Sequence, residues 1–313
     1  MFEKARSKNN DIKSSKLKFK IPHKFFKFPI IGKRLVNING LLDIAKEQIK
    51  AFKPEILYCQ DLSFFPEEIL LEIKKENNIH LIVGQIACPL PPKSFLNPYD
   101  LILTSFPHFV NRLRNDGKNC DYFKIGFDQR ILSKTRKNNR DIDFSFMGGI
   151  SKHHSYASKN IEYLIKNAKL QVYGYGVNKL PFNSNIRRHH KGERWGLDMY
   201  NILSRSKISF NRHINVAENN ANNMRLYEAT GMGSLLLTDR KDNLGQLFEE
   251  DHEIITYNSK EEALDKFNYL INKPEELAKI AKAGQLRTLK DHTYETRIKE
   301  LIQIITKYLK VES

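Results

Sequence analysis

The stretch FNRHINVAENNANNMRLYEATGMGSLLLTD, residues 210–239, decides the fold of this chain. Residues 206–210, the last of which is the first residue of this stretch, predict a short buried strand. Asn223 stands before a run with apolar bulk, and asparagine is a favoured cap at a helix start. Gly231 and Gly233 lie where that helix ends, because glycine tolerates the left-handed cap conformation. Residues 234–237 are apolar and predict a parallel strand, so the stretch has the strand–loop–helix–strand order of an α/β domain.

Two charged side chains at the start of the predicted helix suggest a ligand site. Arg225 and Glu228 are three positions apart and therefore share one helix face. Both lie in the first turns, where free backbone N–H groups and the helix dipole favour an anion. Arg225 could hold a phosphate there, and Glu228 could accept hydrogen bonds from the vicinal hydroxyls of a sugar. The alternative is an intrahelical ion pair on a solvated face, and the spacing alone does not decide between them.

Five segments resemble, in order, the donor-binding half of a group 1 glycosyltransferase with the GT-B fold, in the spore-maturation-protein-like branch. The segments are DFSFMGG (143–149), LQVYGYG (170–176), GLDMYNILSRSKISFNRH (196–213), MRLYEATGMGSLLLTD (224–239) and DHTYETRIKELI (291–302). The resemblance implies an α/β protein with two Rossmann-like domains whose parallel sheets face each other across a cleft. It also implies a nucleotide-sugar as donor substrate, no cofactor, and a carbohydrate or lipid-linked acceptor in envelope or polysaccharide synthesis.

The same resemblance implies a set of site residues. The donor-binding set comprises Gly148, Gly149, Lys152, Gly174, Asn211, Arg212, His213, Asn223, Arg225 and Glu228. Gly148 and Gly149 follow a predicted strand directly, so the backbone there can approach a ligand. Lys152 could neutralise a diphosphate. Related enzymes carry two glutamates eight positions apart; the second aligns with Glu228 and the first falls at Asn220, so that motif is half present.

The chemistry implied is transfer of a sugar from a nucleoside diphosphate, in which the departing negative charge must be stabilised. Arg225 and the helix N-terminus could do this without a metal ion, with Glu228 as the second catalytic residue. An inverting enzyme also needs a base that deprotonates the acceptor. The candidates are Asp61, His108 and Asp100, and a retaining enzyme would need none of them in that role.

The 313 residues suggest two domains of ordinary size. Strands and helices alternate in both halves, which predicts parallel sheets. We expect a basic, aromatic lead-in (1–40), an acceptor-side domain (41–133), a donor domain (141–292) and a closing helix (293–313) that packs back toward the first domain. The opening strand and glycine turn of the family are not visible in the lead-in, so the first domain is predicted to be abbreviated.

The net charge of +16 favours anionic partners. Residues 1–34 carry eleven Lys or Arg against Glu3 and Asp11, with five interleaved phenylalanines. This mixture suits an anionic membrane surface, nucleic acid, or a loosely packed lead-in. Three scattered cysteines and the lack of a long apolar run indicate a cytoplasmic protein, peripheral at the membrane if the lead-in docks there.

Two other readings stay open. GT-B folds also host epimerases and glucosyltransferases that modify DNA, and the basic charge is compatible with a nucleic-acid acceptor. A degenerate GT-B protein would only bind an anionic polymer or a membrane. The loop up to Arg194 holds Arg187, Arg188, His189 and His190, which either reach the nucleotide base or form a solvated basic loop.

Overall fold

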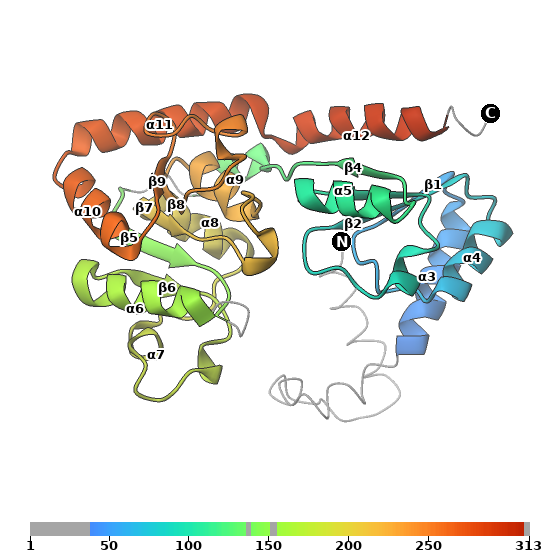
Figure 1. The fold of residues 1–313 in the computed structure, drawn as a ribbon, viewed down its shortest axis with the longest axis horizontal. Coiled ribbons are helices and arrows are strands. Elements are labelled where there is room, and N and C mark those ends of the chain that lie inside the picture. The colour runs from blue at the N-terminus through green and yellow to red at the C-terminus, as the bar shows by residue number, and fades with distance from the viewer. Residues whose placement is uncertain (1–37, 136–138, 151–154, 310–313) are drawn as a thin grey trace. The chain divides into compact units, whose positions relative to one another are not determined.

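The computed structural model describes residues 38–135, 139–150 and 155–309 (Figure 1). The predicted lead-in segment 1–34 and Lys152 lie outside these ranges. The described chain divides into two compact units, Met1–Glu55 with Glu68–Ile79 and Ile56–Glu67 with His80–Ser313. Each unit is described by itself.

The first unit holds two helices that the sequence predicts. These are α3 (Ile38–Phe52) and α4 (Glu67–Glu76). The Nζ atom of Lys46 lies 2.8 Å from Oε2 of Glu72 and joins the two helices. Both side chains are partly exposed, and an exposed pair of this kind contributes about 1 kcal/mol or less.

The second unit begins with a four-stranded parallel sheet. Its strands are β1 (Ile56–Cys59), β2 (Leu81–Ile86), β3 (Leu101–Thr104) and β4 (Cys120–Tyr122), in the order β1-β2-β3-β4. Helix α5 (Pro107–Asn115) connects β3 to β4. All four residues of β3 are buried, as expected for a central strand with both faces covered. The predicted alternation of strands and helices into a parallel sheet is therefore confirmed for the first half.

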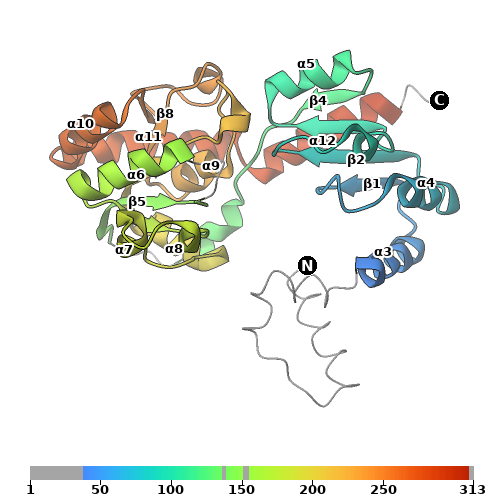
Figure 2. The same ribbon diagram turned by 60° about the horizontal axis from the view of Figure 1, so that its bottom comes forward.

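Helix α12 (Tyr294–Leu309) lies along this first sheet, as two views show (Figures 1 and 2). It packs Leu301, Ile304, Ile305, Tyr308 and Leu309 against a cluster from β2, β3 and the residue Phe123. Ile298 and Ile302, on the same helix, are both more than half exposed. They lie at the border of the stripe, one step round the helix from the residues that touch the sheet.

The second sheet has five parallel strands in the order β6-β5-β7-β8-β9. They are β5 (Ile142–Met147), β6 (Gln171–Tyr173), β7 (Ser206–Asn211), β8 (Leu235–Asp239) and β9 (Ile255–Tyr257). The chain runs from β5 outward to β6 and then returns to β7 on the other side of β5. The carboxyl ends of β5 and β7 therefore form a topological switch point, where open α/β sheets bind their ligands.

Helices cover both faces of this sheet. They are α6 (Ser155–Ala168), α7 (Asn185–His189), α8 (Gly196–Arg205), α9 (Met224–Gly231), α10 (Lys260–Ile271) and α11 (Pro274–Asp291). Successive residues of β8 point to opposite faces: Leu235 and Leu237 join one buried cluster, and Leu236 joins the other. The apolar run that predicts β8 is thus explained by burial on both sides.

The segment after β4 is tied to the start of α12. Phe127 N donates to His292 O at 2.8 Å, and Tyr294 N donates to Phe127 O at 2.9 Å. The buried side chain of Arg297 donates from Nε to Ile125 O at 3.3 Å and from Nη2 to Nδ1 of His292 at 2.8 Å. Because an arginine always donates, Nδ1 of His292 accepts, which leaves its proton on Nε2. In the part of the chain that the structure describes, no helix is long and apolar enough to cross a membrane.

Candidate functional site

The start of α9 is fixed by the predicted cap. Asn223 has extended backbone geometry, and its Oδ1 accepts a hydrogen bond from Leu226 N at 3.2 Å. Its Nδ2 donates to Oδ1 of Asn211 at 3.0 Å and to Arg212 O at 3.3 Å. One side chain therefore caps the helix and binds it to the end of β7. This places the N-terminus of α9 at the switch point of the sheet.

A polar network continues along the ends of the neighbouring strands. Asn211 Nδ2 donates to Oγ1 of Thr238 at 2.9 Å, and Tyr257 OH donates to Asn211 O at 2.9 Å. Asp239, at the end of β8, accepts from the backbone N of His213 at 3.0 Å and lies 2.7 Å from its Nδ1. These contacts hold the loop after β7 in one conformation.

Asp239 and His213 form a buried pair. Burial opposes ionisation of Asp239, but the hydrogen bonds from His213 and the charges of His213 and Lys241 outweigh it, so the net pKa of Asp239 is lowered. The side chain of His213 is fully buried, and its Nε2 has no hydrogen-bond partner among the described residues. A buried ring nitrogen without a partner is uncommon. It lies within the protein, closed off from the surface.

Glu228 is buried, and Arg225 is partly buried beside it. Nη1 of Arg225 lies 2.8 Å from Oε2 of Glu228, with the side chains 14% and 6% exposed. The intrahelical ion pair weighed from the sequence is present, but its helix face is not solvated. Nε of Arg225 also donates to Met147 O at 3.2 Å, at the end of β5. The guanidinium group therefore spans from α9 to the carboxyl end of β5.

Tyr200 on α8 approaches the same carboxylate. Its hydroxyl donates to Oε1 of Glu228 at 3.4 Å. Burial first, and then the charge of Glu228, raise the pKa of Tyr200. Tyr200 therefore stays protonated and can act as a hydrogen-bond donor. The sulfur of Met199 contacts the terminal nitrogens of Arg225 at 3.4 and 3.5 Å.

The glycines after β5 and β6 allow the two strand ends to approach closely. Gly174 has φ +127°, and a Cβ atom on it would lie 2.0 Å from Gly148 O. A Cβ atom on Gly149 would lie 2.5 Å from a ring carbon of Tyr175. Neither position has room for a side chain unless a neighbour moves. The backbone after β5 therefore packs closely against the backbone after β6 and the ring of Tyr175.

The structure brings most of the predicted donor-binding set to one edge of the second sheet. Gly148, Gly149, Gly174, Asn211, Arg212, His213, Asn223, Arg225 and Glu228 lie at or beside the carboxyl ends of β5, β6 and β7 or at the start of α9. Lys152 lies outside the described residues. Roles for Tyr200, Met199 and Asp239 were not predicted from the sequence. Only Asp239 carried a signal in the sequence, as a carboxylate directly after a predicted strand.

Two of the predicted base candidates, Asp61 and His108, make different hydrogen bonds. Asp61 follows β1, and its Oδ1 accepts from Ser63 N at 2.9 Å. His108 accepts at Nδ1 from Asn220 at 3.1 Å and donates from Nε2 to Val216 O at 3.2 Å. Its two ring nitrogens are therefore both engaged, and it would have to release a hydrogen bond to act as a base.

Asp100, the third base candidate, lies away from the carboxyl edge of the first sheet. This residue precedes β3, and its Oδ2 accepts from Ile82 N, near the start of β2, at 2.7 Å. It therefore lies at the amino edge of the first sheet, whereas ligands of open α/β sheets bind at the carboxyl edge.

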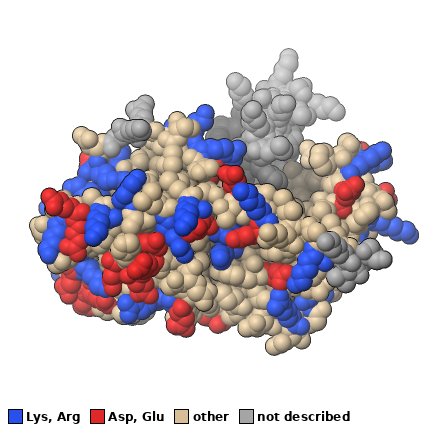
Figure 3. Space-filling model, turned by 90° about the horizontal axis from the view of Figure 1, so that it is seen from above, with Lys and Arg blue, Asp and Glu red and all other residues tan. Residues whose placement is uncertain are grey.

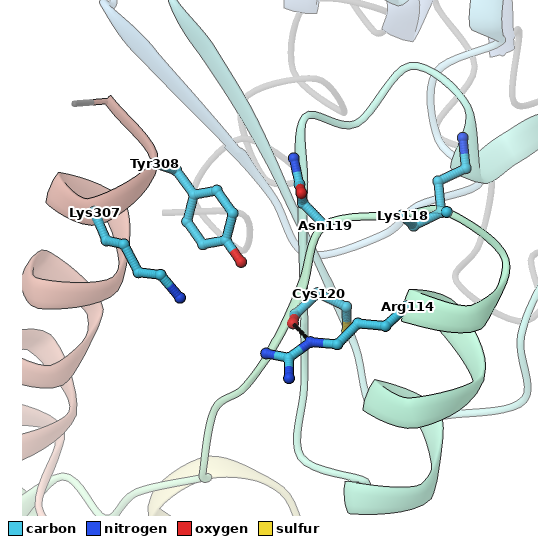
Figure 4. Close-up of a pocket in the computed structure, with 7 residues that line it drawn as sticks. Arg114, Lys118, Asn119, Cys120, Lys307 and Tyr308 are labelled. Atoms are coloured by element: carbon cyan, nitrogen blue, oxygen red, sulfur yellow. Dashed lines mark hydrogen bonds between the residues drawn. The ribbon is translucent and has the colours of Figure 1, made fainter. Parts of the chain in front are cut away.

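A surface hollow of about 480 Å³ lies between the end of α12 and the start of β4 (Figure 4). The guanidinium group of Arg114 and the amino group of Lys307 point into it, as does the hydroxyl of Tyr308. Asp121 already pairs with Arg114 and lies 3.8 Å from Nζ of Lys307. Burial first, and then the charge of Asp121, raise the pKa of Tyr308 to about 12. The cluster holds the end of α12 to the sheet, and we assign it no ligand.

The positive charge of the chain is unevenly distributed along the sequence. Eleven Lys or Arg against two acids in residues 1–34 account for nine of the sixteen excess charges. On the face drawn in Figure 3, Lys and Arg side chains are interspersed with Asp and Glu. That face therefore has no single basic area that would dominate association with a polyanion.

Two parallel α/β sheets, with a capped helix at the switch point of the second, define a protein of the GT-B class. A family profile described as "Glycosyl transferase-like" matches residues 134–303, more than half of the chain. The chain belongs to this glycosyl transferase-like family. A search of curated protein sequences found no match.

Solved structures of the same fold are similar over most of this chain. Anabaena HepE in complex with UDP-glucose aligns with a TM-score of 0.63 and 11% identity, over 86% of this chain and 82% of that one. A glycosyltransferase from Rickettsia africae aligns with a TM-score of 0.61 and 14% identity, over 93% and 84%. An α-glucosyltransferase in complex with UDP-glucose and DNA containing an abasic site aligns with a TM-score of 0.62 and 13% identity. The alignment covers 87% of this chain and 84% of that one. At these identities the likeness establishes the fold alone.

Proposed function

We propose that this protein transfers a sugar from a nucleotide-sugar donor to an acceptor. The observation that carries the proposal is the position of Arg225. It lies at the capped N-terminus of α9, donates to the carbonyl group at the end of β5, and pairs with Glu228. The family membership and the UDP-glucose bound to HepE support the same reading.

The leaving diphosphate would lie against the start of α9. Its growing negative charge is stabilised by the helix N-terminus and by the guanidinium group of Arg225. Gly148 and Gly149 have no side chains that would keep the phosphates from the backbone after β5. This set needs no metal ion, and we propose a metal-independent transfer with no cofactor.

Glu228 has two roles in this proposal. Its carboxylate holds Arg225 in one orientation, because the pair is buried and joined at 2.8 Å. It also accepts hydrogen bonds from the hydroxyl groups of the donor. Tyr200 fixes the other carboxylate oxygen. We propose UDP as the leaving nucleotide, since HepE is solved with it.

The acceptor side of the proposal rests on the sequence. We propose residues 141–292 as the donor domain and 41–133 as the acceptor side, with an envelope, polysaccharide or lipid-linked acceptor. Asp61 is the preferred base if the enzyme inverts. We propose a cytoplasmic protein that docks peripherally on an anionic membrane through residues 1–34.

A second candidate function is glycosylation of nucleic acid. It is favoured by the basic composition and by the fold shared with a glucosyltransferase solved with DNA. Nucleic-acid binding of this kind weakens steeply with salt and is indifferent to free nucleotide.

The test compares donor binding of three proteins. The wild type, Arg225→Lys and the control Arg205→Lys are titrated with UDP, GDP, CDP and dTDP, and the shift in melting temperature is measured with and without magnesium. Arg205 is a matched control because it pairs with Asp141 at the far end of α8. We expect one nucleotide to stabilise the wild type and the control without magnesium.

Arg225→Lys keeps the charge but loses the forked geometry that binds phosphate. It should weaken binding of the selected nucleotide about tenfold or more. The site assignment is refuted if Arg225→Lys and the control bind that nucleotide equally well. The whole proposal fails if no nucleotide stabilises the wild type.

A further inference from the structure

The segment 175–197 exposes an unusual number of large apolar side chains. Tyr175 is 48% exposed, Phe182 84%, Trp195 60% and Leu197 46%. Tyr175 and Trp195 are in contact, and exposed apolar side chains that gather mark a site of interaction more often than single ones do. We call residues 175–197 the aromatic–basic segment.

The rings of this segment are held in place by the protein itself. Tyr175 and Trp195 stack with ring centroids 5.6 Å apart and planes inclined by 20°. Trp195 Nε1 donates to Oε2 of Glu193 at 3.3 Å. The guanidinium group of Arg187 lies 3.9 Å from the ring centroid of Phe182 and donates to Leu180 O at 3.1 Å. A ligand that stacks on these rings would therefore not need to order them first.

The same segment carries a local excess of positive charge. Its Lys and Arg residues are Lys179, Arg187, Arg188, Lys191 and Arg194, and its acid is Glu193. Four of these cations, all except Arg187, are exposed. This excess favours a ligand with negative charge over a neutral one.

The segment also borders the proposed donor site. It begins directly after β6, and the ring of Tyr175 covers the backbone of Gly149. Gly149 follows β5, whose last carbonyl group, that of Met147, accepts the hydrogen bond from Arg225. A molecule bound on the Tyr175 and Trp195 rings would therefore lie beside the group that is transferred.

We infer that the aromatic–basic segment, although it belongs to the proposed donor domain, binds part of the acceptor, and that this acceptor is an acidic carbohydrate. The inference rests on the proposed function. Flat aromatic rings stack on the apolar faces of sugar rings, while the exposed cations pair with carboxylate or phosphate groups of the same chain. A neutral carbohydrate would leave the cations unmatched, and a small anion would leave the rings unused.

Trp195 is the only tryptophan of the chain, so tryptophan emission reports on this surface directly. The probes are an oligogalacturonate, a neutral malto-oligosaccharide of equal length, oligo(dT) and UDP. We expect the oligogalacturonate to change the emission in a salt-dependent manner and the neutral oligosaccharide to have no effect. Saturation with UDP should leave oligogalacturonate binding intact.

Variants decide whether the segment itself is responsible. Phe182→Ala and Arg188→Gln should each weaken oligogalacturonate binding about tenfold, a loss of about 1.4 kcal/mol, and leave the UDP thermal shift unchanged. The matched controls are Leu286→Ala and Lys282→Gln, which remove an exposed apolar group and an exposed cation from α11. They should bind as the wild type does.

Three outcomes would overturn the inference. The first is binding of oligo(dT) without binding of oligogalacturonate, which assigns the surface to nucleic acid. The second is competition between UDP and oligogalacturonate, which assigns it to the donor. The third is unchanged binding in Phe182→Ala and Arg188→Gln. If UDP does not raise the melting temperature of the wild type, the proposed function is refuted instead. Failure of the inference and failure of the proposed function are therefore distinguishable.

Discussion

His292 should make the protein less stable as the pH falls from 6.5 toward 4. Its Nε2 donates to Leu247 O at 2.8 Å, its Nδ1 accepts from Arg297, and the residue is 2% exposed. Burial is the main cause that lowers its pKa from 6.5 to about 4, with further contributions from the charges of Arg297, Arg287 and Lys124. The folded protein therefore keeps this histidine neutral over a range in which the unfolded chain protonates it.

The magnitude follows from the two pKa values. Above pH 6.5 both states hold His292 neutral, so it adds no pH dependence there. Below pH 6.5 the unfolded state binds the extra proton and gains stability. At 1.36 kcal/mol for each factor of ten, the loss is about 2 kcal/mol at pH 5 and about 3 kcal/mol near pH 4. This is a large part of the stability of an ordinary domain.

The assay is urea unfolding followed by circular dichroism across this pH range, for the wild type, His292→Gln and Phe248→Leu. Glutamine can accept from Arg297 and donate to Leu247 O, but it does not titrate. The stability difference between the wild type and His292→Gln should change by about 3 kcal/mol across the range. Phe248 packs against His292, so Phe248→Leu should lower stability by a constant amount at every pH. Parallel pH profiles for wild type and His292→Gln would refute the reasoning.

Two further predictions concern the site, and urea unfolding measures both. Arg225→Met should lower the free energy of unfolding by about 3 kcal/mol, because it leaves the Glu228 carboxylate buried and unpaired. Adding Glu228→Gln should restore most of that loss. An equal loss in the double variant would contradict this reasoning. Gly174→Ala should destabilise the protein by about 2 kcal/mol or more, since φ is +127° and the new Cβ meets Gly148 O. Gly245→Ala, which has open space at the same atom, is its control and should be nearly neutral.

The elements with a strong local signal were predictable. The Asn223 cap, the end of α9 at Gly231 and the apolar run of β8 each follow from the chemistry of a few adjacent residues. Helix α7 (Asn185–His189) was not predicted, because five residues give too short a pattern to distinguish from the basic loop that contains them.

The site was predictable as a set of residue types but not as an arrangement. The sequence indicated Arg225 and Glu228 and left open whether they form a solvated pair. Their burial depends on β5 and α8, which lie far away in the sequence. The hydrogen bond from Tyr200 to Glu228 and the partners of His108 likewise join residues 28 to 112 positions apart. No local pattern encodes such contacts.

The sequence by itself determined an α/β protein of parallel strands, with glycines after β5 and a capped helix after β7. These features depend on backbone preferences and on alternation of burial, which act over a few residues. The tertiary structure alone decided the strand order β6-β5-β7-β8-β9, and with it the switch point at which Arg225, Gly148 and His213 meet. Strand order depends on the packing of distant segments onto both faces of one sheet, and that packing is a property of the whole folded chain.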